Sequence, residues 1–326
     1  MEEEIRQMSA LFNTNLNKFN STRNYYNNLI RSWRINYRVK QYYFNYITNW
    51  YNNQKNILIR KKESKLREIH LKYNYSPPAP EPLKKAFLVG INYQNTSAEL
   101  RGCVNDVNDL KHMLTTKYNY SESNILTLTD SQATKQNIMT RLTQLLQSCQ
   151  AGETLFFSFS GHGYFWNDIY KKDEIDGKDE LIVTVDNYAI VDDELKYVID
   201  TYLKENVTLI ALFDNCHSGT ILDLPYQYFK GEQEMIHHSL SSDTKGTVIC
   251  LSGCRDDQVS MDAYLDGDFN GAMTFNFIEL LNENNSLTWK ACLEQLRQKL
   301  QAGNFNQVPQ ITCGKQMDLN TLSVKL

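Results

Sequence analysis

Residues 154–163 read TLFFSFSGHG, and residues 207–219 read VTLIALFDNCHSG. Each stretch opens with a short run of aromatic and aliphatic side chains and then reaches glycine, which is the pattern of a buried strand. In an open parallel sheet, ligands bind beyond the carboxyl ends of the strands. Two adjacent strands would therefore bring the imidazole of His162 and the thiol of Cys216 to one edge of the sheet. A thiolate there can attack a carbonyl carbon while the imidazole transfers protons.

Strand and helix patterns alternate around these two stretches. Strands are predicted at 86–91, 125–128, 154–159, 207–213, 247–252 and 307–313, and helices at 104–118, 135–149, 192–203, 273–282 and 287–301. Such alternation is typical of a mostly parallel sheet with right-handed crossovers and helices on both faces. The predicted fold class is therefore α/β.

The charge is distributed unevenly along the chain. Residues 1–75 carry 14 Lys and Arg against 5 Asp and Glu, a net +9, whereas residues 76–326 carry 20 against 33, a net −13. In the first segment no acidic residue lies between Glu4 and Glu63, and apolar side chains recur every three or four residues, which predicts one or two amphipathic helices. The run SPPAPEP at 76–82 breaks the helix, because proline lacks the amide donor. We place a linker at 76–83 and a second domain at 84–326.

Composition limits the class of protein. The chain has no uninterrupted apolar run of membrane-spanning length, and it begins with an acidic segment instead of a basic and then apolar leader. Seven cysteines without framework spacing favour free thiols in a reducing compartment, so we expect a cytoplasmic protein. The absence of CxxC pairs and of His-Glu-x-x-His spacing disfavours zinc.

Residues next to His162 and Cys216 are candidates to assist attack of the thiolate on a carbonyl carbon. His162 stands between Gly161 and Gly163, which allow backbone to come close to a substrate. The amides of Gly163 and Cys216 are candidates to stabilise an oxyanion. His217 points away from Cys216 on an extended chain, so we interpret it as a structural histidine.

Carboxylates crowd the loops expected at the same edge, at 173–180, at 192–194 and at Asp223. Loops of this kind can supply the oxygen ligands that calcium prefers. By composition alone, a solvated acidic face with a helix cap at Asp192 is the better interpretation. Asp106, taken alone, is likewise typical of a helix-capping carboxylate.

From about Lys84 to its end, the chain resembles the metacaspases, which are caspase-like cysteine proteases, in the type I arrangement of a prodomain followed by a catalytic domain. The resemblance rests on ordered motifs: FLVGINY at 87–93, LRGCVND at 100–106, SGHG at 160–163, DGKDE at 176–180, DNCHSG at 214–219 and DLPY at 223–226. A histidine that precedes the cysteine by about 50 residues also fits the general caspase pattern.

This resemblance implies that Cys216 is the nucleophile and that His162 transfers protons. It also implies a pocket for the residue that precedes the cleaved bond, lined by Cys103, Asp106, Ser160 and Asp214. Two carboxylates in a closed pocket select a cation, so the implied substrates are proteins or peptides with Arg or Lys at that position. The family further implies calcium as an activator, with candidate ligands Asp179, Asp192, Asp193 and Asp223.

Self-processing of a zymogen is implied between a large part, 84–228, and a small part, 247–326. The linker at 229–246 contains Lys230-Gly231 and Lys245-Gly246, and exposed polar segments are where proteolysis concentrates. Two features depart from the family. Asn215 stands where a small Ser or Ala is common, and residues 1–75 lack the proline/glutamine-rich or zinc-finger sequence of known prodomains.

Residues 1–75 leave three interpretations open. A basic helical arm can pack on the acidic catalytic domain and shield its pocket, and a helix with basic and aromatic faces can also bind an anionic membrane surface or nucleic acid. We expect the chain to be a monomer. The alternatives to a protease are a caspase-like scaffold or adaptor and a cysteine-dependent acyl transferase.

Overall fold

The computed structural model describes residues 2–32, 37–73, 83–167, 178–215, 218–228, 236–237, 241–253, 262–265, 268–284 and 286–326. The chain divides into two compact units, Met1–Glu81 and Pro82–Leu326. The linker predicted at 76–83 lies outside the described residues, except for Leu83.

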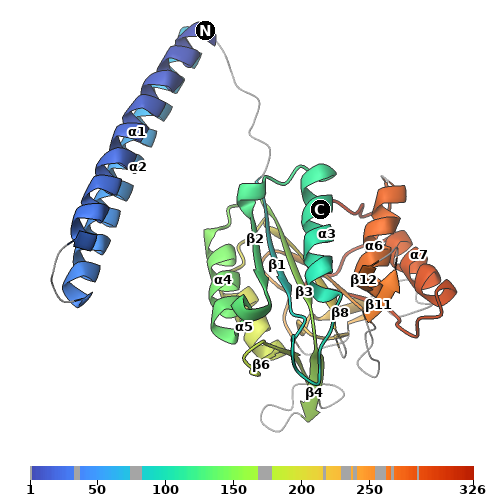
Figure 1. The fold of residues 1–326 in the computed structure, drawn as a ribbon. Helices are drawn as coiled ribbons and strands as arrows, with labels where there is room; N and C mark the ends of the chain where they lie inside the picture. The colour runs from blue at the N-terminus through green and yellow to red at the C-terminus, as the bar shows by residue number, and fades with distance from the viewer. Residues whose placement is uncertain are drawn as a thin grey trace. The chain divides into compact units, whose positions relative to one another are not determined.

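The amino-terminal unit is a pair of long helices, α1 (Glu2–Ser32) and α2 (Tyr37–Lys72). Neither Gly nor Pro occurs in residues 1–73, so no strongly helix-breaking residue interrupts them. The two helices run antiparallel (Figure 1), with an ion pair between Glu4 and Lys72 and a hydrogen bond from the Tyr51 hydroxyl to Asn20 Oδ1 (2.7 Å). The sequence predicts one or two helices in this unit, and the structure contains two.

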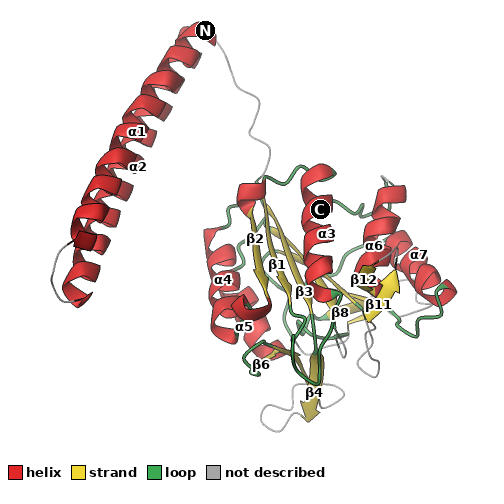
Figure 2. Cartoon of the chain, viewed as in Figure 1, coloured by secondary structure: helices red, strands yellow, loops and turns green. Residues whose placement is uncertain are grey.

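The second unit is built around an eight-stranded sheet with the order β2-β1-β3-β7-β10-β13-β8-β9. The strands are β1 (Lys84–Gly90), β2 (Ile125–Thr129), β3 (Thr154–Ser160), β7 (Thr208–Asp214), β8 (Tyr226–Tyr228), β9 (Ile236–His237), β10 (Thr247–Ser252) and β13 (Gln310–Cys313). The strands from β2 to β10 in this order pair in parallel, and β13, β8 and β9 join by antiparallel pairing. The predicted mostly parallel α/β sheet is confirmed (Figure 2).

Helices cover both faces of this sheet (Figure 1). One face carries α3 (Cys103–Thr116), α6 (Ala272–Glu283) and α7 (Trp289–Ala302), and the other carries α4 (Lys135–Ser148) and α5 (Asp192–Tyr202). Alternation along β1 creates the two cores, since Ala86 and Leu88 join the first and Phe87 and Val89 the second. Strands buried on both faces explain why the sequence shows continuous apolar runs here.

Several short strands were not evident in the sequence pattern. β4 (Gly163–Asn167), β5 (Lys178–Val183) and β6 (Ala189–Val191) form an antiparallel sheet, and β11 (Asp262–Leu265) pairs with β12 (Asp268–Gly271). Short, partly polar strands have too little periodicity to be separated from loops. β13 also begins three residues later than predicted, after Pro309, because proline cannot donate to the strand ladder.

Membrane-spanning segments were sought among the helices. None in the described part of the chain is both long and apolar enough to cross a bilayer.

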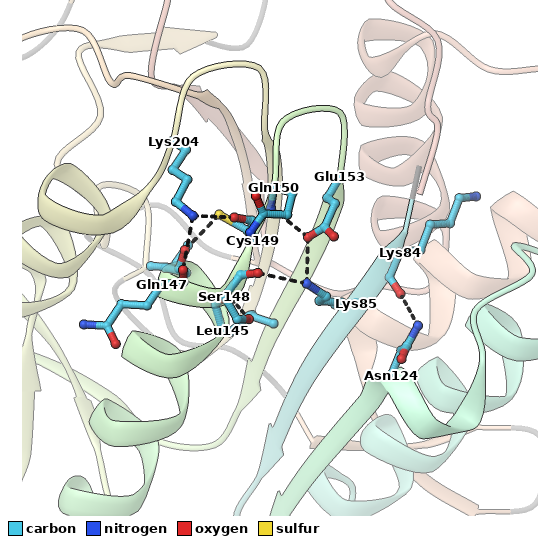
Figure 3. A network of polar contacts seen from close by, with 11 residues as sticks. Lys84, Lys85, Asn124, Leu145, Gln147, Ser148, Cys149, Gln150, Glu153 and Lys204 are labelled. Carbon is cyan, nitrogen blue, oxygen red and sulfur yellow. Dashed lines mark hydrogen bonds and ion pairs between the residues drawn. The ribbon is translucent and has the colours of Figure 1, made fainter. Parts of the chain in front are cut away.

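Polar contacts hold the end of the sheet where β1 and β3 begin (Figure 3). Lys85 donates to the carboxylate of Glu153 (2.7 Å), and the Gln150 amide donates to the same carboxylate (3.0 Å). Nearby, Lys204 donates to the carbonyl of Cys149 (2.6 Å). Glu153 is 5% exposed, and the ammonium group of Lys85 balances its charge inside the protein. These contacts tie the turn between α4 and β3 to β1, at the end of β3 remote from His162.

We expect Glu153→Gln to lower the free energy of unfolding by about 2 kcal/mol, because it removes the anionic partner of a partly buried ammonium group. Urea unfolding measures this loss. The matched control is Glu283→Gln, which breaks a more exposed pair with Lys299 (2.9 Å). That variant should change stability by less than about 1 kcal/mol. Equal losses in the two variants would contradict the structural role of Glu153.

Candidate active site

The carboxyl ends of β3 and β7 lie side by side. The two strands pair in parallel with Ser160 opposite Asp214, and the Gly161 amide donates to the carbonyl of Asp214 (3.4 Å). His162 follows Ser160 by two residues, and Cys216 follows Asp214 by two. The predicted adjacency of the two strands is therefore confirmed. Cys216 and His217 themselves lie outside the described residues.

The imidazole of His162 is oriented by a backbone carbonyl. Its Nε2 lies 2.6 Å from the carbonyl oxygen of Ala98. A carbonyl oxygen can only accept, so Nε2 carries the proton in this contact, and Nδ1 is the nitrogen that can accept a proton in the neutral ring. The ring also lies against that of Tyr93, with 4.6 Å between the ring centroids.

Tyr93 holds the backbone at His162. Its hydroxyl accepts from the His162 amide (2.9 Å) and donates to the carbonyl of Val183 (2.6 Å). The side chain is 5% exposed, and burial raises the pKa of the phenol above its ordinary value, so the hydroxyl stays neutral. Sequence reasoning missed this role, because Tyr93 is 69 residues from His162 and carries no local signal of catalysis.

Three of the four residues predicted to form the specificity pocket come together. Ser160 donates its hydroxyl hydrogen to the carboxylate of Asp106. A Cβ placed on Gly271 would lie 2.4 Å from Asp214 Oδ2 and 2.6 Å from Asp106 Oδ2. Both carboxylates thus meet over the same glycine, and Asp106 and Asp214 are 1% and 4% exposed. The fourth residue, Cys103, is buried at the start of α3.

The amino-terminus of α6 supplies backbone donors to these carboxylates. The Gly271 amide donates to Asp106 Oδ1 (2.9 Å), and the Thr274 amide donates to Asp214 Oδ2 (2.8 Å). The positive end of the helix dipole favours negative charge at this position. Asp106 lies in the first turn of α3 but makes these contacts with α6 and β3, so the interpretation of Asp106 as a cap of its own helix is wrong.

A second group of carboxylates lies around the start of α5. The pKa of Asp192 is raised to about 9. Burial is the largest cause, the charge of Asp223 is the next, and the charge of Glu180 acts in the same direction. Asp192 also accepts from the Glu180 amide (2.6 Å), and the Thr220 hydroxyl donates to the Glu180 carboxylate. The group therefore connects β5 and α5 with the loop that follows Cys216. Asp192 is fully buried, so it is not part of a solvated acidic face.

The other two predicted calcium ligands behave differently. Asp179 accepts from the Trp166 indole (3.0 Å) and precedes Glu180 on β5, so the two side chains point to opposite faces of the strand. Asp193 is half-buried and donates its amide to Asp192 Oδ1 (2.7 Å). Across the residues that the structure describes, no group of three or more His, Cys, Asp or Glu side chains is arranged to hold a metal ion.

The two candidate self-cleavage positions also differ. The carbonyl of Lys245 accepts from Lys315 (2.8 Å), and Gly246 is buried against the carbonyls of Val207 and Lys204. Cleavage after Lys245 would therefore require local unfolding. Lys230 lies outside the described residues.

Comparison with known proteins identifies relatives of this chain. The family described as metacaspase, peptidase C14 domain, matches residues 84–225. The chain is 35% identical over 296 residues to metacaspase-1 of Eremothecium gossypii, covering 73% of this chain and 65% of that protein. It is 32% identical over 311 residues to metacaspase-1 of Schizosaccharomyces pombe, covering 78% and 72%. The chain thus spans slightly less than two thirds of the first relative.

A solved structure supports the fold. The crystal structure of a protein from Geobacter sulfurreducens matches 75% of this chain and 98% of its own, with a TM-score of 0.56 and 21% sequence identity.

We expect Tyr93→Phe to lower the free energy of unfolding by about 1–3 kcal/mol, because the His162 amide and the Val183 carbonyl lose their shared partner in a buried site. Chemical denaturation measures the change. Tyr197→Phe is the matched control, since Tyr197 is 66% exposed and its hydroxyl makes no hydrogen bond among the described residues. A Tyr93→Phe variant as stable as this control would show that the bridge contributes nothing.

Proposed function

The chain belongs to the metacaspase family of caspase-like cysteine endopeptidases, and we propose that it cleaves peptide bonds after Arg or Lys with Cys216 as nucleophile. The main support is the meeting of the buried carboxylates Asp106 and Asp214 over Gly271, directly beside the strand end that leads to His162. A guanidinium or ammonium group is the natural partner for two convergent carboxylates.

The proposed reaction uses the two strand ends together. Nδ1 of His162 takes the proton of the Cys216 thiol, and the thiolate attacks the scissile carbonyl carbon. His162 then gives that proton to the leaving amine as the carbon–nitrogen bond breaks, leaving a thioester. In the second stage His162 takes a proton from water as the water oxygen attacks the thioester carbon. The carbon–sulfur bond then breaks, the acyl product leaves as a carboxylic acid, and His162 returns the proton to the Cys216 thiolate. Throughout, the Ala98 carbonyl can accept from Nε2 and favour the imidazolium that forms.

We assign the oxyanion to the amides of Gly163 and Cys216. Gly163 is the first residue of β4 and immediately follows His162. A glycine at this place lets a substrate carbonyl approach the backbone closely. Donors of this kind act on the charge that develops in the tetrahedral intermediate.

We propose calcium as an activator and not as a reactant. Of the four candidate ligands, Asp192 and Asp223 are the two that lie close together, since the charge of Asp223 acts on the buried carboxyl of Asp192. Carboxylate oxygens are the donors that calcium prefers. A bound cation would neutralise the group and stabilise the loop that joins Cys216 to Thr220 and Asp223. The family resemblance also implies Asp179 and Asp193, which the described structure does not bring into one metal-holding group with Asp192 and Asp223.

Self-processing is part of the same proposal. Of the two lysines in the linker at 229–246, Lys230 is the better candidate, because the Lys245-Gly246 bond is held by Lys315 and by buried backbone. The large and small parts would then be 84–228 and 247–326.

The direct test is a fluorogenic panel of Arg, Lys and Asp peptides, assayed with calcium and with a chelator. We expect turnover of Arg and Lys peptides in calcium, a marked loss in chelator, and no turnover of Asp peptides. Cys216→Ala should abolish activity, because it removes the nucleophile. The control for calcium is the far-UV circular dichroism spectrum of the protein in chelator, which should be unchanged.

Persistent cleavage of Arg peptides by Cys216→Ala would refute the catalytic assignment. Acylation of Cys216 without peptide cleavage would instead indicate an acyl transferase. Absence of both acylation and cleavage in the folded protein would indicate a scaffold or adaptor.

A second prediction concerns Gly271, whose φ of −64° and ψ of 125° suit any residue. We expect Gly271→Ala to lower kcat/KM for Arg peptides by about tenfold or more, because its methyl group displaces both carboxylates. The change should appear mainly in KM, and the rate of Cys216 alkylation by iodoacetamide should stay the same. These kinetics are measured on the same Arg peptide.

Gly303→Ala is the control, since the added methyl group would meet the Phe305 ring and the Lys299 carbonyl at the end of α7, and neither of the two carboxylates. It should leave KM unchanged. Unchanged kinetics in Gly271→Ala would mean that the two carboxylates do not form the specificity pocket.

A further inference from the structure

The helical pair of the amino-terminal unit leaves many large apolar side chains uncovered. Among its described residues, the buried apolar side chains are those of Ile30, Tyr51 and Ile69. In contrast, several others are between 37% and 63% exposed: Leu11, Tyr25, Leu29, Val39, Tyr46 and Ile57. A two-helix unit with so little burial is not expected to be stable without a further partner.

These exposed side chains form one stripe on each helix. On α1, Leu11 and Leu29 are 18 residues apart, which is five turns, and Tyr25 lies within about 40° of the same line. On α2, Val39 and Ile57 are also 18 residues apart, and Tyr46 lies within about 20° of their line. Each stripe is therefore straight, and on α1 Lys18 and Thr22 lie on the same line between Leu11 and Tyr25.

The two stripes open on the same side of the helical pair. A groove at the open end of the pair is lined by Leu11 and Gln7 from α1 and by Glu68 and Lys72 from α2. Leu11 lies on the α1 stripe, and Glu68 follows Ile57 by three turns, so it lies on the α2 stripe. Since both stripes border one groove, they lie on the same side of the pair. We call the six exposed residues on this side the apolar face: Leu11, Tyr25, Leu29, Val39, Tyr46 and Ile57.

The segment that carries this apolar face is strongly cationic. The segment between Glu4 and Glu63 contains 11 Lys and Arg and no Asp or Glu. The acidic residues of the unit gather at its open end, where Glu3, Glu4 and Glu68 pair with Arg6, Lys72 and Lys65. The part of the unit nearer the helix connection therefore has apolar and cationic side chains without balancing anions of its own.

This combination favours one class of partner. Binding a second copy would bring two strongly cationic segments together, and they would repel each other. Nucleic acid would bind the cations but would not bury aliphatic side chains such as Leu29, Val39 and Ile57. An anionic bilayer satisfies both requirements, because aliphatic side chains enter the acyl boundary, tyrosines occupy the interface, and Lys and Arg contact acidic headgroups. We propose that the apolar face binds the surface of an anionic lipid membrane and holds the enzyme there.

The experiment uses the full chain with Cys216→Ala, which prevents self-cleavage, and sedimentation with vesicles. We expect binding to vesicles of phosphatidylcholine with phosphatidylserine, little binding to phosphatidylcholine alone, and weaker binding at high salt. The triple substitution Leu29→Ser, Val39→Ser and Tyr46→Ser should lower the partition coefficient at least tenfold. The matched control places serine at Asn24, Asn52 and Asn56, which are exposed and lie off the apolar face, and it should bind like the parent.

A second variant guards against loss of folding. Arg60→Gln with Lys61→Gln keeps the apolar face and the helix-forming character of both exposed positions. It should bind phosphatidylserine vesicles several-fold less tightly and show a weaker dependence on salt. Circular dichroism of each variant checks that the helices are intact.

Four results would overturn the proposal. The first is equal binding to both kinds of vesicle, and the second is vesicle binding that the triple serine variant retains. The other two apply if the protein does not bind lipid: a dimer that the triple serine substitution dissociates, or nucleic-acid binding that the triple serine substitution abolishes. If vesicles are not bound but deletion of residues 1–73 alters peptide cleavage, the face serves the catalytic unit and the membrane proposal is wrong. None of these results depends on the substrate specificity.

Discussion

The parallel pairing of β3 with β7 is the constraint on which the active site depends. Its register sets Ser160 opposite Asp214, so the two strands end at the same edge, two residues before His162 and Cys216 in the sequence. Side chains alternate along each strand, and a shift by one residue would turn Ser160 and Asp214 to the other face. The same shift would exchange the side chains of the two hydrophobic cores, which is why the apolar packing of the sheet also fixes the geometry of the site.

The pocket depends equally on a segment far along the chain. Gly271 and Thr274, at the start of α6, donate backbone hydrogen bonds to Asp106 and Asp214. Backbone donors can hold a carboxylate in a fixed position. These two hydrogen bonds link Asp106 on α3 and Asp214 on β7 to the start of α6. The buried group of Asp192, Asp223 and Glu180 forms a second link, between the loop after Cys216 and β5.

The two units of the chain use their apolar residues in different ways. The catalytic unit encloses two cores between its sheet and its helices, whereas the helical pair encloses few side chains and leaves an apolar face uncovered. Helix formation in the first unit follows from local sequence, because no Gly or Pro interrupts it. Its stability and its role depend on what covers that face, and local sequence does not specify a partner.

By itself, the sequence determined the main strands and helices, the class of the sheet and the positions of His162 and Cys216 at strand ends. These are local properties, since apolar periodicity and glycine act over a few residues. It did not reveal β4 to β6, whose short strands are stabilised by pairing with one another. Only the tertiary structure decided that Tyr93 supports His162, that Gly271 lies against two carboxylates, and that Glu180 rather than Asp179 lies beside Asp192. Each of these contacts either joins residues that are distant in sequence or depends on the face of the strand on which a side chain lies. Strand pairing and helix packing determine both the distant contacts and the face.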